Sequence, residues 1–360
     1  MTPATIAQLE VAEATANSLQ SIDELTPILF GAAAFQQLNA ACELGLFELL
    51  HERPNLCKDE IATDLNLQPR AIDILLLGTT ALRLTDKVGP LYCNSKVIND
   101  MVSNGTWHIF KDTVAFEQYI CYLGQFDFAE SLRSNTNVGL RRVPGSGRDL
   151  YRRLSESPDL QKVFYRYMHS WSELSNPLLF RNLDLSRARR VLDVGGGDGV
   201  NAIGLVKAFP HLEVTVLELP GGATIARRQV TEAGLSDRIT IIEHDMFQGE
   251  FPKGFDLVLF SHLLVIWVPE ENVALLKNAY RALEPGGRVA IFSSISNDEG
   301  SGPLMAALDS VYFAAVPAEG GMIYAWRQYE EWLRKSGFKR LERVECGTWT
   351  PHGLICGYKD

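Results

Sequence analysis

The residues best suited to chemistry form a glycine-rich segment flanked by carboxylates, Asp-Val-Gly-Gly-Gly-Asp-Gly at positions 193–199. An apolar run precedes this segment and a helical pattern follows it. Glycines at such a turn let the backbone bend tightly and approach a ligand without a Cβ in the way. A further acid, Glu218, ends the next apolar run, where its carboxylate can accept hydrogen bonds from both ribose hydroxyls. The pattern predicts a nucleoside-binding turn.

The charges around the turn indicate which nucleoside it binds. Dinucleotide-binding turns usually read GxGxxG and place a pyrophosphate on a helix N-terminus, whereas here Asp193 precedes the glycines and Asp198 stands among them. Carboxylates repel a pyrophosphate but suit a ligand that carries an ammonium and a sulfonium. The segment His-Asp-Met-Phe at 244–247 offers an acid and apolar side chains for the edge and face of an adenine. The sequence therefore favours S-adenosylmethionine over a nicotinamide dinucleotide.

The second half of the chain has the alternation of strand and helix patterns that would position this turn. Short apolar runs alternate with helical stretches from residue 190 onward, which is typical of an α/β fold with a parallel sheet. We expect a Rossmann-like, doubly wound sheet in a catalytic domain over residues 183–360, with a linker at 182–189. The expected strands are 190–194, 213–218, 239–243, 255–261 and 287–293.

The first half of the chain is predicted to be mostly helical. Residues 58–84 read as two helices and 87–92 as a hairpin, which is the order of a winged helix within a domain over 1–105. The helix that begins at Arg70 is mostly apolar, whereas a DNA-recognition helix needs polar side chains that reach base edges. We therefore expect a dimerisation and lid module, followed by an aromatic-rich helical segment over 106–182 that supplies the substrate pocket.

Bulk properties exclude several classes of function. The net charge of −10 argues against a nucleic-acid partner and against a ligand-sensing winged-helix regulator. No apolar run is long enough to span a membrane, and the polar, acidic segment 1–20 is unlike a signal peptide. The six cysteines are scattered without metal-ligand spacing, which indicates a reducing, cytoplasmic location and no metal site.

Together, the motifs at 193–199, at 244–247 and at 283–288 (Leu-Glu-Pro-Gly-Gly-Arg) resemble those of class I S-adenosylmethionine-dependent methyltransferases. The whole chain is similar to their small-molecule O-methyltransferase branch, found in plants and in bacterial natural-product and antibiotic pathways. The resemblance implies a winged-helix dimerisation domain and a homodimer whose partner helps to close the pocket. The residues expected to bind the cofactor are Asp193, Gly195, Gly197, Glu218, Leu219, Asp245, Met246, Phe247, Ser261 and His262.

The resemblance breaks at the general base. In this branch a His-Asp-Trp motif follows the fourth strand, and its His deprotonates the acceptor hydroxyl. Here Trp267 fits, but Val265 and Ile266 occupy the His and Asp positions, and Ser293 stands nearest to the place of a supporting Glu. Valine cannot accept a proton. Three alternatives remain open: methylation of an acceptor activated in another way, such as a ring carbon; methylation by proximity alone; and a cyclase or lyase that binds the cofactor without transferring its methyl group.

His169 is the candidate for a replacement base, because it lies in the helix that faces the substrate pocket in this family. Asp309 and Glu319 are other possible acids or bases, for which solvation is the simpler expectation. The segment 321–324 (Gly-Met-Ile-Tyr), followed by a Glu-Glu-Trp-Leu helix, resembles bacterial members that methylate ring carbons of hydroxylated aromatic amino acids. We therefore expect a methyltransferase acting on a small phenolic metabolite, at carbon or otherwise at oxygen. The expected substrate-binding residues are Trp171, Tyr312, Tyr324 and Trp326.

Overall fold

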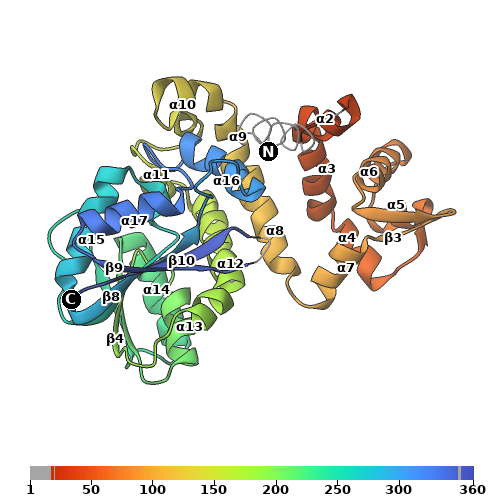
Figure 1. Cartoon of the computed structure of the whole chain (residues 1–360). Helices are drawn as coiled ribbons and strands as arrows, with labels where there is room; N and C mark the ends of the chain where they lie inside the picture. Colours follow the sequence, from red (N-terminus) through yellow and green to blue (C-terminus); the bar gives the residue numbers. More distant parts are fainter. Residues whose placement is uncertain (1–17, 20, 348–349) are drawn as a thin grey trace, which may run out of the picture. The chain divides into compact units, whose positions relative to one another are not determined.

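The structure, a computed structural model, describes residues 18–19, 21–347 and 350–360. Figure 1 shows its helices and strands. The polar segment 1–20 considered above lies almost entirely outside the described residues. The chain divides after Val114 into two compact units, which are described separately below. The domain boundaries expected after residues 105 and 182 remain predictions.

The first unit combines helices with a small three-stranded sheet. Strands β2 (Thr85–Val88) and β3 (Leu91–Asn94) form an antiparallel hairpin, and β1 (Leu56–Cys57) pairs with the other edge of β3. Two helices, α5 and α6, precede the hairpin, so the predicted winged-helix order is confirmed. The helices are α2 (Ile22–Leu29), α3 (Gly31–Glu43), α4 (Leu46–Glu52), α5 (Lys58–Asp64), α6 (Pro69–Ala81) and α7 (Lys96–Ser103), and α8 (Trp107–Phe116) spans the unit boundary.

The second helix of the winged-helix module, α6, is apolar on its exposed side as well as on its buried side. Ile72, Leu75 and Leu76 are buried in the core of the unit, whereas Ile74 and Leu77 are 45% and 74% exposed. Exposed apolar side chains on one helix are typical of a surface that packs against protein. This exposure agrees with the dimerisation role that the sequence predicts for the module.

The second unit is built on a seven-stranded sheet in the order β6-β5-β4-β7-β8-β10-β9. Five parallel strands lie at the expected segments, except that β8 begins earlier than expected, at Leu283. The predicted Rossmann-like sheet is thus confirmed, while β9 and β10 add an antiparallel edge that was not predicted. The strands are β4 (Arg190–Val194), β5 (Glu213–Glu218), β6 (Ile239–Glu243), β7 (Phe255–Ser261), β8 (Leu283–Ser294), β9 (Arg340–Glu345) and β10 (His352–Tyr358).

Helices cover both faces of this sheet. Apolar side chains of α15 and α17 pack on one face, and those of α12, α13 and α14 pack on the other. Short turns of 3-10 or π helix lie at Glu117–Cys121, Val138–Arg142 and Leu264–Ile266. The helices are α9 (Tyr122–Gln125), α10 (Phe128–Ser134), α11 (Leu150–Leu154), α12 (Pro158–Asn182), α13 (Val200–Ala208), α14 (Pro220–Glu232), α15 (Pro269–Ala282), α16 (Leu304–Ala315) and α17 (Trp326–Lys335).

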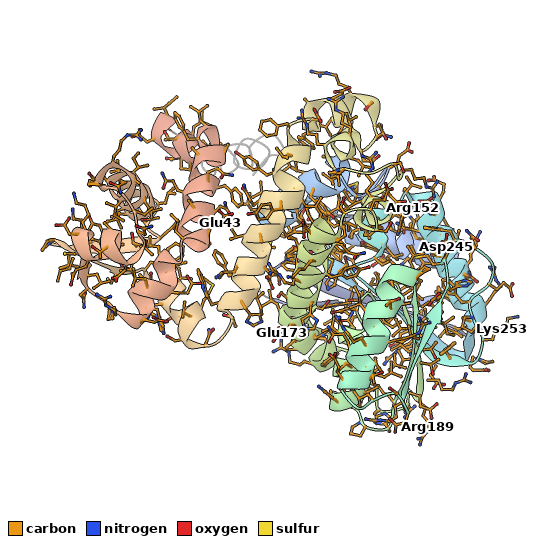
Figure 2. All side chains as sticks on the ribbon, turned by 180° about the vertical axis from the view of Figure 1, so that it is seen from behind. Glu43, Arg152, Glu173, Arg189, Asp245 and Lys253 are labelled. Atoms are coloured by element: carbon orange, nitrogen blue, oxygen red, sulfur yellow. The ribbon has the colours of Figure 1, made fainter. Side chains whose placement is uncertain are left out.

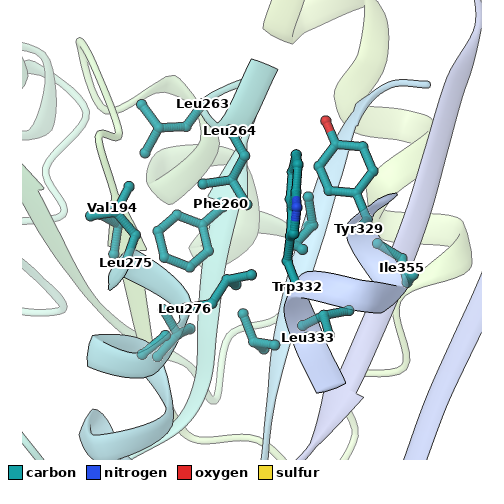
Figure 3. Packing of buried hydrophobic residues seen from close by; sticks show 14 of the residues in the cluster. Val194, Phe260, Leu263, Leu264, Leu275, Leu276, Tyr329, Trp332, Leu333 and Ile355 are labelled. Carbon is teal, nitrogen blue, oxygen red and sulfur yellow. The ribbon is translucent and has the colours of Figure 1, made fainter. Parts of the chain in front are cut away.

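The packing around β7 shows how the core holds the end of a strand in place. Phe260 lies beside Leu275 and Leu276 of α15, and Trp332 of α17 belongs to the same core (Figure 3). All four side chains are at most 3% exposed. Burying one such side chain stabilises a fold by about 1.5–3 kcal/mol. This packing fixes the position of Ser261, the last residue of the strand.

Candidate functional site

A cavity opens at the carboxyl ends of the parallel strands, where open α/β sheets bind their ligands. Its lining comes from the turns that follow β4, β5, β6 and β7 and from aromatic residues of α12 and α16, all within the second unit. Most of the residues expected to bind cofactor or substrate meet there. Those in the lining are Trp171, Gly195, Gly197, Glu218, Leu219, Asp245, Met246, Phe247, Ser261, His262 and Tyr312.

The glycine turn has the backbone that its sequence requires. Gly195 and Gly197 have φ values of +69° and +59°, which residues with a Cβ rarely adopt. Gly196 is constrained by space instead, because a Cβ there would lie 2.6 Å from Oδ2 of Asp193. No described atom lies within 4 Å of a Cβ built on Gly197, so the turn is open at that residue.

Glu218 links the glycine turn to the end of β5. Its Oε2 accepts a hydrogen bond from the Gly197 N–H at 2.9 Å, and its Oε1 accepts one from the Leu219 N–H at 2.8 Å. Burial raises the pKa of Glu218 to about 7, although these two N–H groups partly oppose the shift. A carboxylate held in this way presents its remaining lone pairs to the cavity, where ribose hydroxyls can donate to them.

Asp193 lies beneath the turn and does not belong to the cavity lining. Its side chain is fully buried, and neither carboxylate oxygen has a hydrogen-bond partner among the described residues. Burial, followed by the nearby charge of Glu218, raises its pKa to about 7. Two acidic groups are thus buried close together without an ion pair to any described Lys or Arg. A positively charged ligand above the turn would favour their charged forms.

The expected cofactor fits this arrangement. S-adenosylmethionine carries an ammonium and a sulfonium, and the pocket offers uncompensated acids together with a glycine turn that a Cβ would obstruct. In the third turn, Oδ1 of Asp245 accepts a hydrogen bond from the Phe247 N–H at 3.0 Å. The Phe247 ring meets Trp267 edge to face, with the ring centroids 4.8 Å apart. These groups provide a polar edge and apolar faces for an adenine.

His262 occupies a strained position at the end of β7. Its φ is +55°, and its Nε2 lies 3.2 Å from the Ser175 hydroxyl. Its Nδ1 has no hydrogen-bond partner in the part of the chain that the structure describes. Burial lowers its pKa well below the usual value, with a smaller contribution from His352, whose ring lies 5.1 Å away. His262 is therefore a neutral imidazole in the cavity wall.

His169, the expected base, is placed beside the cavity and not in its lining. Its Nδ1 lies 2.7 Å from Oδ2 of Asp198, and the His169 side chain is 42% exposed. Asp198 does line the cavity and is 6% exposed. The pair thus connects the half-exposed imidazole to the pocket through a buried carboxylate.

Two of the four expected substrate residues lie outside the cavity lining. Tyr324 is 1% exposed, and its hydroxyl lies within hydrogen-bond distance of the carbonyls of Trp267 and Gly320. Trp326 is buried against Gly353, where a Cβ would lie 2.3 Å from the indole ring. Both assignments remain predictions, without a cavity contact in the structure to support them.

The positions of the usual His and Asp form an apolar wall. Val265 and Ile266 line the cavity and are 2% and 6% exposed. The Val265 carbonyl accepts a hydrogen bond from the Met322 N–H at 2.9 Å, which anchors this wall to the loop after α16. Neither side chain can accept a proton.

Several lining residues were not singled out from the sequence as site residues. Tyr151 and Arg152 belong to the short helix α11, and Figure 2 labels Arg152 together with Asp245, which lines the same cavity. Asp309 also lines the cavity, although solvation was the simpler expectation for it. A carboxylate one turn before Tyr312 on an apolar helix is the one signal that could have pointed to Asp309.

Metal-binding groups and membrane-spanning helices were looked for among the residues that the structure describes. Among them, no group of three or more His, Cys, Asp or Glu side chains is arranged to hold a metal ion. None of the described helices is both long and apolar enough to cross a membrane.

Two protein-family models and a curated relative match this chain. Residues 127–339 match the O-methyltransferase domain, and residues 27–102 match the O-methyltransferase dimerisation domain. The chain is 57% identical to the L-tyrosine C(3)-methyltransferase of Streptomyces lavendulae, over 94% of this chain and 93% of that protein.

Solved structures are also similar to this chain over most of its length. The apo form of the S-adenosylmethionine-dependent methyltransferase SibL is similar with a TM-score of 0.83 and 49% identity, covering 94% of this chain and 99% of that one. PigF with SAH is similar with a TM-score of 0.80 and 25% identity, covering 94% of this chain and all of that one.

Proposed function

Because this chain belongs to the O-methyltransferase family, we propose that it methylates a ring carbon next to the hydroxyl of L-tyrosine or of a closely related amino acid. The family membership confirms the enzyme class and the cofactor expected from the sequence: the protein is an S-adenosylmethionine-dependent methyltransferase. The likeness to the tyrosine C(3)-methyltransferase, which extends over nearly the whole chain, is the observation that carries the proposal.

The apolar wall supports carbon as the acceptor. Transfer to a phenolic oxygen in this family relies on a base at the position of Val265, which here offers only methyl groups. A ring carbon next to a phenolic hydroxyl is nucleophilic through the electrons of the ring, so its attack does not require a base at that place. The residues of the wall then orient the ring, which supplies the positional part of catalysis.

When bound, S-adenosylmethionine supplies a methyl group on a positively charged sulfur. Glu218 would hold the ribose and the glycine turn would hold the methionine part. Tyr167 and Trp171 of α12 pack with their ring centroids 5.9 Å apart and help to form a wall for a flat ring.

The ring carbon loses a proton when it gains the methyl group. We assign the acceptance of this proton to His169, acting at the edge of the cavity with Asp198. The 2.7 Å contact between them supports this role, because a carboxylate on Nδ1 stabilises the imidazolium that forms. The chemistry is then balanced: one carbon–carbon bond forms, one carbon–sulfur bond breaks with its electron pair remaining on sulfur, and one proton leaves.

We also propose that the protein is a cytoplasmic homodimer serving a natural-product pathway. The match of residues 27–102 to a dimerisation domain supports the dimer, as do apolar side chains exposed on the first unit, including Leu77 at 74% and Val97 at 60%. All six cysteines are free thiols, as in a reducing compartment. Light scattering of the purified protein tests the dimer, since a monomer at micromolar concentration would contradict it.

The function is tested by incubating the protein with S-adenosylmethionine labelled in its methyl group and with L-tyrosine. We expect one added methyl group by mass spectrometry, a position next to the hydroxyl by NMR, and one equivalent of S-adenosylhomocysteine. A cofactor that binds but is never consumed, with tyrosine or related hydroxylated aromatic amino acids, would instead support the non-methylating cyclase or lyase. Methylation at oxygen would refute the carbon assignment alone.

A further inference from the structure

Asp309 is an acidic side chain that faces the cavity without a partner. It lies on α16, belongs to the cavity lining, and is partly exposed there. It forms no hydrogen bond or ion pair with any residue that the structure describes. A carboxylate that is partly withdrawn from water without gaining a partner is costly, so a ligand that compensates its charge would stabilise it.

A second carboxylate, that of Glu117, is near enough for its charge to act on Asp309. Glu117 begins the π-helical turn Glu117–Cys121 and lies near the side chains of Cys121 and Gln125. Burial and the charge of Glu117 raise the pKa of Asp309 to about 7, and burial raises the pKa of Glu117 to about 7. Each shift reflects a negative charge that no Lys or Arg of the described chain balances. A cation placed here would meet two acids.

Aromatic rings surround the cavity side of Asp309. Phe116 stacks on Tyr167 with the ring centroids 3.9 Å apart, and it meets Tyr312 edge to face at 5.1 Å. All three rings line the cavity together with Asp309. Aromatic faces attract ammonium groups through their quadrupoles, so rings and a carboxylate in one pocket form a receptor for an organic cation.

This acidic end is separate from the acids at the glycine turn. Asp193 and Glu218 stand at the ends of β4 and β5, whereas Asp309 stands on α16 and Glu117 in the π-helical turn. The cofactor has its own acids at the turn, which leaves Asp309 for the other molecule in the cavity. That molecule is an aromatic amino acid, which carries an ammonium at the end remote from its hydroxyl.

Building on the proposed function, we infer that Asp309, backed by Glu117 and flanked by Phe116, Tyr167 and Tyr312, binds the α-ammonium group of the substrate. The site makes the enzyme select amines over neutral or anionic phenols. Holding the ammonium at α16 also fixes which ring carbon faces the cofactor, so the carboxylate contributes to the position of methylation as well as to affinity.

The test compares three ligands that differ only in their charged groups: L-tyrosine, tyramine without the carboxylate, and 3-(4-hydroxyphenyl)propanoate without the ammonium. Calorimetry measures their binding to the full chain in the presence of S-adenosylhomocysteine, so the result does not depend on methyl transfer. We expect the two amines to bind about 100-fold more tightly than the propanoate. The variant Asp309→Asn should lose this factor for both amines and leave the propanoate unchanged.

Glu319→Gln is the matched control, because Glu319 is exposed and lies on the segment that follows α16. It should bind all three ligands as the wild type does. Asp309→Asn should also bind S-adenosylhomocysteine normally and unfold at the same temperature as the wild type or above it, since it removes an uncompensated acid. Loss of S-adenosylhomocysteine binding would assign Asp309 to the cofactor and overturn the inference.

The remaining outcomes separate this inference from the proposed function. Unchanged tyrosine binding by Asp309→Asn, or equal binding of the propanoate and tyrosine by the wild type, would overturn the ammonium site and leave methyl transfer standing. Selective binding of amines by a wild type that transfers no methyl group to them would support the ammonium site and refute the proposed function.

Discussion

The Nδ1 atom of His169 lies 2.7 Å from Oδ2 of Asp198, and only the Asp belongs to the cavity lining. A carboxylate that accepts the Nδ1–H leaves Nε2 as the proton-accepting nitrogen. Asp198 also accepts a hydrogen bond from the Val200 N–H at 3.2 Å, so the start of α13 fixes the carboxylate. The pair is therefore held in a form that can receive a proton.

We expect His169→Asn to lower kcat by about 100-fold, since general bases contribute about 10²–10⁴ to rates. The amide of Asn can still donate to Asp198 but cannot accept a proton. Binding of S-adenosylhomocysteine, measured by calorimetry, should not change. His211→Asn is the control, because the His211 ring is hydrogen-bonded to the Leu185 carbonyl and does not line the cavity. Unchanged turnover of His169→Asn would show that His169 does not accept the proton. His262, the imidazole in the cavity wall, would then be the next candidate.

Glu218→Gln should weaken the binding of S-adenosylhomocysteine. Hydrogen bonds to charged groups contribute about 1.5–3 kcal/mol, which corresponds to about 10- to 100-fold in affinity. Calorimetry measures the change. Glu243→Gln is a matched control, because Glu243 pairs with Glu218 in the sheet register yet is exposed and bound to Arg227. A similar loss in both variants would mean that general charge, and not contact with the ribose, is responsible.

Gly196→Ala should destabilise the second unit. The new Cβ would lie 2.6 Å from Oδ2 of Asp193 and 2.8 Å from Cγ1 of Val216, and overpacking of this kind costs about 1–3 kcal/mol. Urea unfolding gives the difference in the free energy of unfolding. Gly221→Ala in α14 meets nothing closer than 3.8 Å and should be neutral or gain up to about 1 kcal/mol. Equal stability of both variants would show that the loop relaxes freely.

Asp193→Asn should change how stability depends on pH in the absence of cofactor. Burial raises the pKa of Asp193 from 3.8 to about 7, so the folded protein binds more protons than the unfolded chain between these values. Its contribution to stability is present below about pH 4 and is lost as the pH rises through about 7. Asn does not titrate. The free energy of unfolding of the variant, relative to that of the wild type, should therefore increase by about 2–4 kcal/mol from acidic to alkaline pH.

This pH effect is measured by urea unfolding of both proteins near pH 5 and near pH 8. The free energy of unfolding of the variant should exceed that of the wild type by more near pH 8 than near pH 5. Asp237→Asn, at an exposed position, should differ from the wild type by the same small amount at both values. A gain of Asp193→Asn that does not vary with pH would contradict the titration and point to packing alone.

Local patterns in the sequence were enough to predict the fold class and the cofactor. Each parallel strand is a short apolar run, because a strand buried on both faces needs apolar side chains throughout. The glycine turn follows β4 directly, and Glu218 ends β5, so the residues that approach the cofactor stand next to the elements that carry them. The strand β9 has the charged sequence of an exposed edge and therefore gave no such pattern.

Only the tertiary structure decided which side chains share the cavity. Tyr324 and Trp326 follow a glycine turn, as pocket residues often do, yet the packing of α17 draws both into the core. Asp309 and Glu117 are remote in sequence, yet the fold brings Glu117 near enough for its charge to act on Asp309. Contacts of this kind depend on how helices pack against one another over long sequence separations, which no local periodicity encodes.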